Sequence, residues 1–157
     1  NDAGFPGRLA ISYATGDEIG STGAKTPWLG IDPLKLVAGA GWRDPGGRFG
    51  GQLIATHSAG KEARRAGNNY LPDGFTTLDL TAFVRIGDAI TVRGGIFNLT
   101  DTKYAWWSDV RGLGRTVSLT STMAPPTVGT STQPSSVIAD AYTQPGRNAS
   151  VSVSLRF

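Results

Sequence analysis

The sequence lacks cysteine, has a single histidine, His57, and contains no long run of apolar residues. Without cysteine the chain has no disulfide framework, thiolate nucleophile or thiolate metal ligand. One histidine excludes a multi-histidine metal site within the chain. No stretch approaches the roughly eighteen consecutive apolar residues of a membrane-spanning helix. Alternating strands would escape that test, because only every second residue needs to be apolar.

Charge is also scarce, at 17% of residues, and the net charge is only +3. The lysines and arginines are scattered along the chain, so a nucleic-acid-binding surface is not expected. A hydrophobic share of 39% argues against a disordered chain, and 157 residues suffice for one domain. Residues 1–4 have neither the basic start nor the apolar centre of a signal peptide, so any export signal is expected outside this sequence.

The clearest positive signal is a strict alternation at the end of the chain. Val151, Val153, Leu155 and Phe157 alternate with serines and Arg156. Successive side chains of a strand point to opposite faces, so this segment predicts a strand with one apolar and one polar face. An apolar outer face with an aromatic residue at its boundary is typical of a membrane β-barrel. The closing strand of a soluble sandwich or barrel would also alternate.

The same alternation predicts six strands in all. They are expected near residues 8–15, 36–43, 48–57, 76–86, 90–97 and 148–157. Short turn sequences separate the second strand from the third and the fourth from the fifth. The other connections are long, and the longest covers residues 98–145. Its middle, residues 116–136, is rich in Ser, Thr and Pro without a usable period, which predicts an irregular loop.

The connections thus alternate long, short, long, short, long. Outer-membrane barrels have short periplasmic turns and long extracellular loops. A C-terminus in the periplasm places both short turns there and all three long connections outside. Six strands are too few to close such a barrel, and an open sheet would leave unpaired backbone groups in lipid. The predicted fold class is therefore all-β: a segment of about six antiparallel strands belonging to a larger membrane β-barrel.

Two motifs in the long connection resemble a known family. Residues 98–104 read Asn-Leu-Thr-Asp-Thr-Lys-Tyr directly after a predicted strand. This resembles the Asn-Leu-Phe-Asp-x-x-Tyr element near the C-terminus of TonB-dependent outer-membrane receptors, with Thr100 where the family usually has Phe. Residues 107–112, Trp-Ser-Asp-Val-Arg-Gly, resemble the subgroup of haem, haemoglobin, transferrin and lactoferrin receptors, as do residues 141–148 and 31–35.

The resemblance implies a barrel of about 22 strands around an N-terminal plug. Residues 1–157 would supply roughly the last six strands and contain neither the plug nor the TonB-box segment. The implied partners are the remainder of the receptor (possibly as a separate chain), outer-membrane lipid, the TonB complex through the missing N-terminal part, and an extracellular haem-carrier protein. No cofactor or metal site is expected in this chain, and haem would be a transported ligand.

The leading hypothesis is therefore part of a bacterial outer-membrane importer for haem or a haem- or iron-carrying protein, and not an enzyme. The alternatives are an importer of another ligand such as a siderophore, a passive porin-like barrel segment, and a soluble β-sandwich binding module. The sandwich hypothesis requires Leu78, Leu80 and Val84 to pack against a second sheet instead of lipid.

Polar residues on the predicted inner face form the candidate lumen wall. They are Arg8, Arg43, Arg48, Gln52, Asp79, Arg85, Arg93 and Arg156. We interpret them first as a solvated or salt-bridged wall, and otherwise as contacts to the plug or to a passing ligand.

Aromatic residues beyond the strands are the candidates for ligand contact. They are Tyr104, Trp106 and Trp107, together with the loop residues Tyr70 and Tyr142. We interpret the first three mainly as an aromatic girdle at the outer interface, and otherwise as contacts to a flat ligand or a protein partner. His57 is predicted on the lipid-facing side near the outer boundary, where an interfacial role is favoured over haem ligation.

Overall fold

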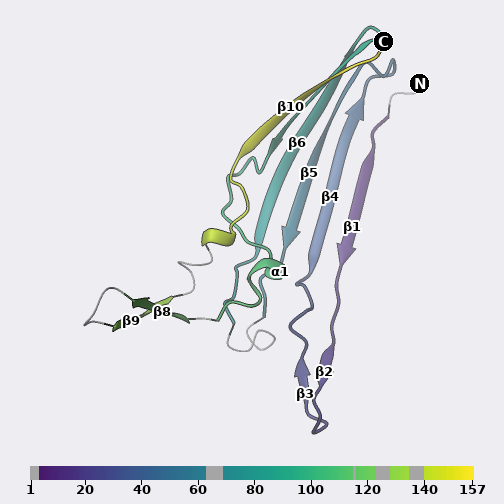
Figure 1. Ribbon diagram of the computed structural model, residues 1–157. Helices are drawn as coiled ribbons and strands as arrows, with labels where there is room; N and C mark the ends of the chain where they lie inside the picture. The colour runs from purple at the N-terminus through teal and green to yellow at the C-terminus, as the bar shows by residue number, and fades with distance from the viewer. Residues whose placement is uncertain (1–3, 63–68, 115, 123–127, 135–139) are drawn as a thin grey trace.

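A single antiparallel sheet of six strands dominates the computed structural model, which describes residues 4–62, 69–114, 116–122, 128–134 and 140–157. The strand order is β1–β4–β5–β6–β7–β10, so each strand pairs with the neighbour that precedes or follows it in this meander (Figure 1). The strands are β1 (Gly7–Ser12), β4 (Lys35–Arg43), β5 (Phe49–Ser58), β6 (Phe75–Ile86), β7 (Ile90–Phe97) and β10 (Asn148–Leu155).

The register places most of the apolar residues of the six strands on one face. Leu53 pairs with Leu80, which pairs with Ile96, and Val153 pairs with Val92 in the same way at the other end of the sheet. This outer face is uncovered: Leu53 is 45% exposed and Val151 75%. Within the described residues no second sheet packs on this face. A lipid-facing surface is expected to be uncovered in this way, whereas a sandwich would require a second sheet against it.

Aromatic residues mark the two ends of this outer face. Trp42 and Phe49 lie at the end of the sheet where the short turns are, and their ring centroids are 5.3 Å apart. Tyr13 and His57 lie at the opposite end. From Phe49 to His57 the outer row of β5 covers about 27 Å along the strand, comparable with the roughly 25 Å apolar band of outer-membrane barrels.

The ends of the edge strands follow from their partners. The sequence predicts strands to Thr15 and Phe157, but β1 ends at Ser12 and β10 at Leu155. Ser12 is the last residue of β1 with a partner on β4, because β4 begins at Lys35. Leu155 pairs with Ile90, the first residue of β7. The other four strands lie within one residue of their predicted ranges.

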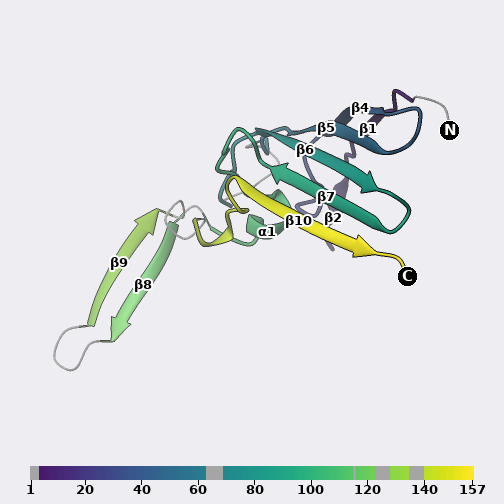
Figure 2. The same cartoon turned by 90° about the horizontal axis from the view of Figure 1, so that it is seen from above.

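The two short turns lie at the same end of the sheet as the C-terminus, and the long connections at the other (Figure 1). In the first turn Gly47 has a φ of 66° and donates its N–H to the carbonyl of Asp44. Gly87 has a φ of 59° in the second. Both positions need the left-handed conformation that glycine adopts without penalty. The view from above shows the sheet as an open arc (Figure 2).

The long connections are more ordered than predicted. Residues 17–32 contain the hairpin β2 (Asp17–Ile19) and β3 (Lys25–Pro27). Within 98–145 lie α1 (Trp107–Val110), β8 (Thr116–Thr122), β9 (Val128–Pro134) and the 3₁₀ turn η2 (Asp140–Tyr142).

The prediction of an irregular loop over residues 116–136 is wrong where the structure describes them. β8 and β9 pair antiparallel from Thr116–Pro134 to Thr122–Val128. Ser and Thr occur at both odd and even positions of these segments. A two-stranded ribbon can therefore form without the apolar alternation by which a half-buried strand is recognised in a sequence. Residues 123–127 and 135–136 of that range lie outside the described residues. None of the described helices is long and apolar enough to cross a membrane.

Candidate functional site: the inner wall and the loop cluster

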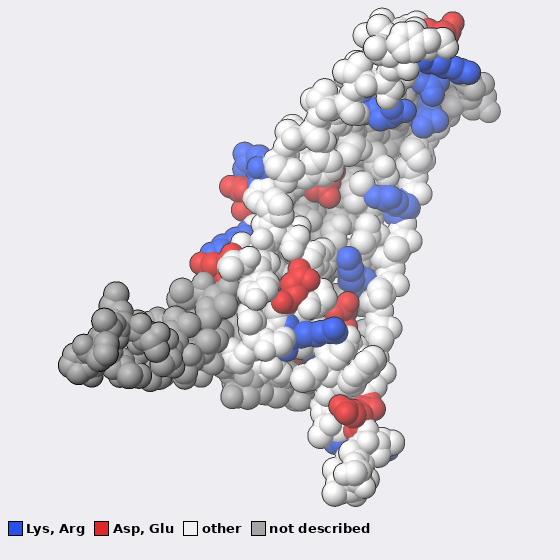
Figure 3. Space-filling model, viewed as in Figure 1, with Lys and Arg blue, Asp and Glu red and all other residues white. Residues whose placement is uncertain are grey.

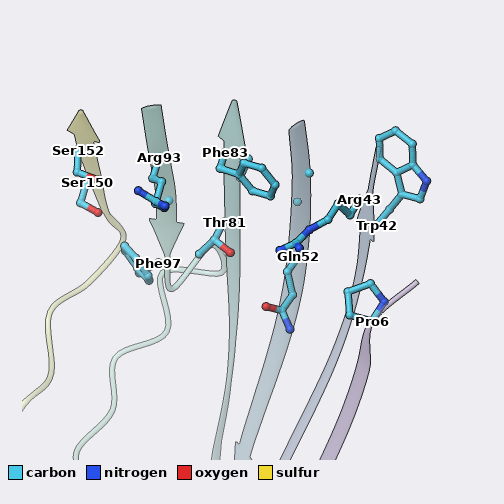
Figure 4. Close-up of a pocket in the computed structure, with 15 residues that line it drawn as sticks. Pro6, Trp42, Arg43, Gln52, Thr81, Phe83, Arg93, Phe97, Ser150 and Ser152 are labelled. Atoms are coloured by element: carbon cyan, nitrogen blue, oxygen red, sulfur yellow. The ribbon is translucent and has the colours of Figure 1, made fainter. Parts of the chain in front are cut away.

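The inner face of the sheet is hollowed by glycines. A Cβ atom on Gly50 would lie 2.8 Å from Cε1 of Phe83, and one on Gly95 would lie 2.8 Å from Cζ of Phe97. Both phenyl rings therefore occupy space that a side chain at position 50 or 95 would fill, so both positions require glycine. The resulting hollow has a volume of about 360 Å³ and extends across the strands from the segment before β1 to β10 (Figure 4).

One cross-strand row of this hollow carries two arginines. Arg43 pairs with Gly50, Gly50 with Phe83, and Phe83 with Arg93. The guanidinium carbon of Arg43 lies 5.4 Å from the centroid of the Phe83 ring. Nη1 of Arg93 donates to the hydroxyl of Ser154 over 3.4 Å. Among the described residues, neither arginine has a carboxylate within ion-pair distance.

The predicted wall residues divide into those that line the hollow and those that do not. Arg43, Gln52 and Arg93 line it. Arg8 and Asp79 share another row of the same face, and Arg85 pairs with Thr91 nearer the short turns. Arg156 follows β10 and donates its N–H to Ala89 at that end of the sheet. Figure 3 views this face and shows basic groups gathered at its upper end, beside the short turns.

Arg48 belongs to the first short turn. Its side chain is 74% exposed and its Nε lies 3.4 Å from Oδ2 of Asp44, four residues earlier. Sequence reasoning missed the aromatic part of the wall, Phe83 and Phe97. The signal for these residues was available: glycines occupy inner-face positions of neighbouring strands, which indicates close approach of large side chains.

Asn98, at the exit of β7, ties the sheet to the long connection. It is 3% exposed and has a φ of 51°. Its backbone N–H donates to Oδ1 of Asp79 over 2.8 Å, and its side-chain amide donates to the carbonyls of Thr102 and Pro145. Its Oδ1 accepts the N–H of Thr102. This residue of the Asn-Leu-Thr-Asp motif thus has a structural function, and Asp79 is engaged in it.

Asp101 completes the connection between β7 and β10. It also has a positive φ, 54°, and its Oδ1 accepts the backbone N–H of Arg147 over 2.7 Å. A Cβ atom on Gly146 would lie 2.8 Å from the same oxygen. The motif therefore holds the entrance of β10 close to the exit of β7, even though about fifty residues of chain separate Asn98 from Asn148.

Three long connections share a small core at the end of the sheet opposite the short turns. Trp107 is 3% exposed and packs with the fully buried Val110, and Tyr70, Leu71, Ala105 and Leu113 contact this pair. The indole N–H of Trp107 donates to the carbonyl of Leu29 over 2.8 Å. Lys61 lies over the Trp107 ring at 4.7 Å and donates to the carbonyl of Ile31. Trp107 is therefore the centre of this loop cluster, and a ligand would reach it only after the loops separate.

Tyr104 and Trp106 form a separate aromatic group with Phe75. The ring centroids of Tyr104 and Trp106 lie 4.2 and 4.8 Å from that of Phe75. The ammonium group of Lys35 lies 4.0 Å from the centroid of Trp106. Burial, and secondly the negative charge of Asp79, raise the pKa of Tyr104 above its ordinary value. Both effects favour the neutral phenol.

The remaining predicted site residues lie elsewhere. Tyr142 is in η2 and exposed, while Tyr70 packs on the loop cluster. His57 shares the outer face with Leu36, and its Nδ1 is hydrogen-bonded to the hydroxyl of Thr76 at 2.9 Å. No group of three His, Cys, Asp or Glu side chains suited to a metal ion occurs in the described part of the chain.

The fold matches a solved transporter structure. The copper transporter OprC superposes with a TM-score of 0.63 over 98% of this chain, at 16% identity, and the match covers 21% of that protein. At this identity the match establishes a shared fold. No family model matches the chain.

Sequence relatives come from Haemophilus and Neisseria species. The haemoglobin and haemoglobin-haptoglobin-binding protein of Haemophilus ducreyi is 29% identical over 56% of this chain. The haemoglobin-haptoglobin utilization protein B of Neisseria meningitidis is 28% identical over 67%, and lactoferrin-binding protein A of that species is 24% identical over 52%. The chain spans only 10%, 14% and 10% of their respective lengths. Their names denote binding and utilization, and none denotes catalysis.

An open antiparallel meander with an uncovered apolar face, matched along its length to a transporter, is a segment of an outer-membrane β-barrel. The match confirms the predicted fold class, a segment of antiparallel strands that belongs to a larger membrane β-barrel. Within that class, its sequence resembles the haemoglobin-, haemoglobin-haptoglobin- and lactoferrin-binding proteins.

Proposed function

We propose that this chain forms wall and extracellular loops of an outer-membrane importer for haem or for a protein that carries haem or iron. The observation that carries the proposal is the similarity, over 56% to 72% of the chain, to several proteins named for binding or utilization of haemoglobin or haemoglobin-haptoglobin. The copper transporter supports the fold and not the ligand, because its identity is only 16%.

The proposed orientation puts the C-terminus and both short turns in the periplasm. The long connections then lie outside the cell, together with the loop cluster around Trp107 and the β2–β3 hairpin. This arrangement follows the usual rule of short periplasmic turns and long extracellular loops. The partners would be the remaining barrel strands and plug, membrane lipid, the TonB complex and an extracellular haem-carrier protein.

The proposed mechanism is selective passage and not catalysis. The apolar face holds the wall in lipid, since its exposed Leu, Ile and Val side chains lose no hydration there. The loop cluster gives the extracellular end a fixed shape, which limits the entropy lost when a carrier protein docks. The inner face offers guanidinium, amide and hydroxyl groups to whatever passes. Haem would be cargo in this scheme, with no resident cofactor in the chain.

The test is growth of the source bacterium on defined iron sources after deletion of the complete receptor. Loss of growth on haemoglobin and on haem, with normal growth on ferric salts and siderophores, is expected. A growth defect confined to a siderophore as the iron source would mean that the imported ligand is that siderophore and not haem. Unchanged haem uptake after removal of TonB would contradict an energised importer and favour a passive porin-like barrel.

A further inference from the structure

The hollow on the inner wall has an unbalanced chemistry. No acidic side chain lines it, while Arg43 and Arg93 both do. The other polar lining groups, Gln52, Thr81 and the serines of β10, are neutral and able to donate hydrogen bonds. Both guanidinium groups are exposed on this face, and a surface that carries charge of one sign attracts groups of the opposite sign. The complement of this surface is therefore anionic.

The shape of the hollow favours a flat partner. Four glycines line it, and the rings of Phe83 and Phe97 lie against glycine backbone, so that flat surfaces form part of its lining. Phe83 stands between the two arginines in one register row (Figure 4). A conjugated ring can stack on a phenyl ring in offset geometry. Guanidinium groups match carboxylates through two parallel hydrogen bonds, which selects carboxylate among anions of similar charge.

The spacing of the arginines limits how one molecule could use both. β5 and β6 lie between β4 and β7, so the backbones of Arg43 and Arg93 are about 14 Å apart. Arg43 leans over Gly50 toward Phe83, whereas Arg93 leans toward Ser154 on β10. A flat ligand on Phe83 thus has a guanidinium on either side, whichever way its carboxylate edge is turned.

We infer that this hollow is a transient subsite for the carboxylate groups of a flat conjugated ligand passing along the barrel wall. With haem as the ligand, its propionates meet Arg43 or Arg93 while the porphyrin lies on Phe83. The inference rests on the proposed function for the identity of the ligand. It adds a position inside the barrel, away from the extracellular loops where a carrier protein would dock.

The experiment measures uptake of iron protoporphyrin IX by whole cells that make the complete receptor with Arg43→Gln and Arg93→Gln combined. Arg8→Gln is the matched control, because Arg8 is an exposed arginine of the same inner face that does not line the hollow. The double variant should import haem roughly tenfold more slowly, from the loss of charge-assisted hydrogen bonds. Arg8→Gln removes a guanidinium group from the same wall but outside the hollow, so it should import haem several-fold faster than the double variant. Surface haemoglobin binding and receptor abundance should be unchanged in both variants.

The dimethyl ester of the same porphyrin separates the carboxylates from the ring. The double variant should import haem no faster than the wild type imports the ester. Equal rates for the double variant and Arg8→Gln would overturn the inference. Entry of bulky antibiotics into cells with the double variant alone would also overturn it. That result would mean that the arginines hold the plug in place and that their loss leaves the barrel open. Absence of haem uptake in the wild type would instead refute the proposed function itself.

Discussion

At the scale of single residues, Asn98 connects more parts of the chain than any motif residue around it. Four of its hydrogen bonds join the end of β7 to Asp79 on β6, to Thr102 and to the segment before β10. Few side chains could replace it. The position requires a positive φ, which Asn tolerates better than most residues, and a buried amide able to donate and accept at once.

We expect Asn98→Ala to destabilise the complete receptor by roughly 2–4 kcal/mol, because several buried hydrogen bonds are lost and alanine is strained at this φ. Thermal unfolding in detergent measures the loss. Asn98→Gly removes the same bonds without the strain and should lie between Asn98→Ala and the wild type. Asn148→Ala is the control, since that exposed side chain bonds only to the carbonyl of Gly146. An equal loss for Asn148→Ala would contradict the assignment.

Tyr104 yields a prediction on pH. Its pKa is raised in the folded protein, by burial and then by Asp79, so folding favours the protonated phenol. The associated stability is fully present below the unfolded pKa of about 10 and is lost as pH rises through the higher folded value. The difference in phenolate absorbance between wild type and Tyr104→Phe should therefore appear only above about pH 10. Ionisation of this residue at a lower pH would contradict a raised pKa for Tyr104.

At the scale of elements, the loop cluster shows how three separate connections become one body. Trp107 and Val110 come from α1, Tyr70 and Leu71 from the connection before β6, and Leu29 from the one before β4. The backbone hydrogen bond from Tyr70 to the carbonyl of Leu113 adds to the same contact. The end of the sheet opposite the short turns is thereby shaped by packing between loops as well as by the strands.

We expect Trp107→Ala to open this cluster and leave the sheet intact. Removing a buried tryptophan costs up to about 3–5 kcal/mol, here confined to local unfolding of the loops. Hydrogen exchange should accelerate at the amide of Tyr70 and remain slow in β5 and β6. Trp28→Ala, which removes an indole that is 56% exposed, should change neither. Exchange at Tyr70 as slow as in the wild type would show that the loops hold together without Trp107.

The sheet strands could be predicted from the sequence because the lipid and the lumen impose opposite polarity on alternate residues, as in β6 and β10. The same reasoning could not find β8 and β9, whose Ser and Thr residues carry no such contrast. It could not bury Trp107 either, because the core around it is assembled from segments far apart in the sequence. Arg48 has the right parity for the wall, but Asp44 holds it in the turn. The sequence thus predicted the arginines that line the hollow, Arg43 and Arg93. It did not predict the contribution of the phenyl rings of Phe83 and Phe97.

At the scale of the whole molecule, the sheet has two free edges, β1 and β10, among the residues that the structure describes. Each presents unpaired backbone groups, and the outer face presents a continuous apolar surface. Both features are unfavourable in water and in lipid unless further strands continue the sheet. The structure thus fits a chain that is stable only within a larger barrel.

Residues 1–157 produced alone should therefore aggregate in aqueous buffer and disperse only with detergent or lipid. Light scattering with and without detergent, on material refolded from urea, measures this. A monodisperse, detergent-free chain with protected backbone amides would contradict the barrel segment and restore the soluble sandwich. Mixing the chain with the remaining part of the receptor should recover a folded, heat-resistant species if the free edges are the only defect.

The Trp107 cluster also has a consequence for the order of folding. The hydrogen bond from its indole to Leu29 joins residues 78 positions apart in the chain. Contacts of such high sequence separation form late, because the entropy of closing the loop opposes them until intervening segments are in place. The surface of the loop cluster would accordingly be the last part of the chain to fold. An antibody specific for it would distinguish finished receptors from those still being assembled.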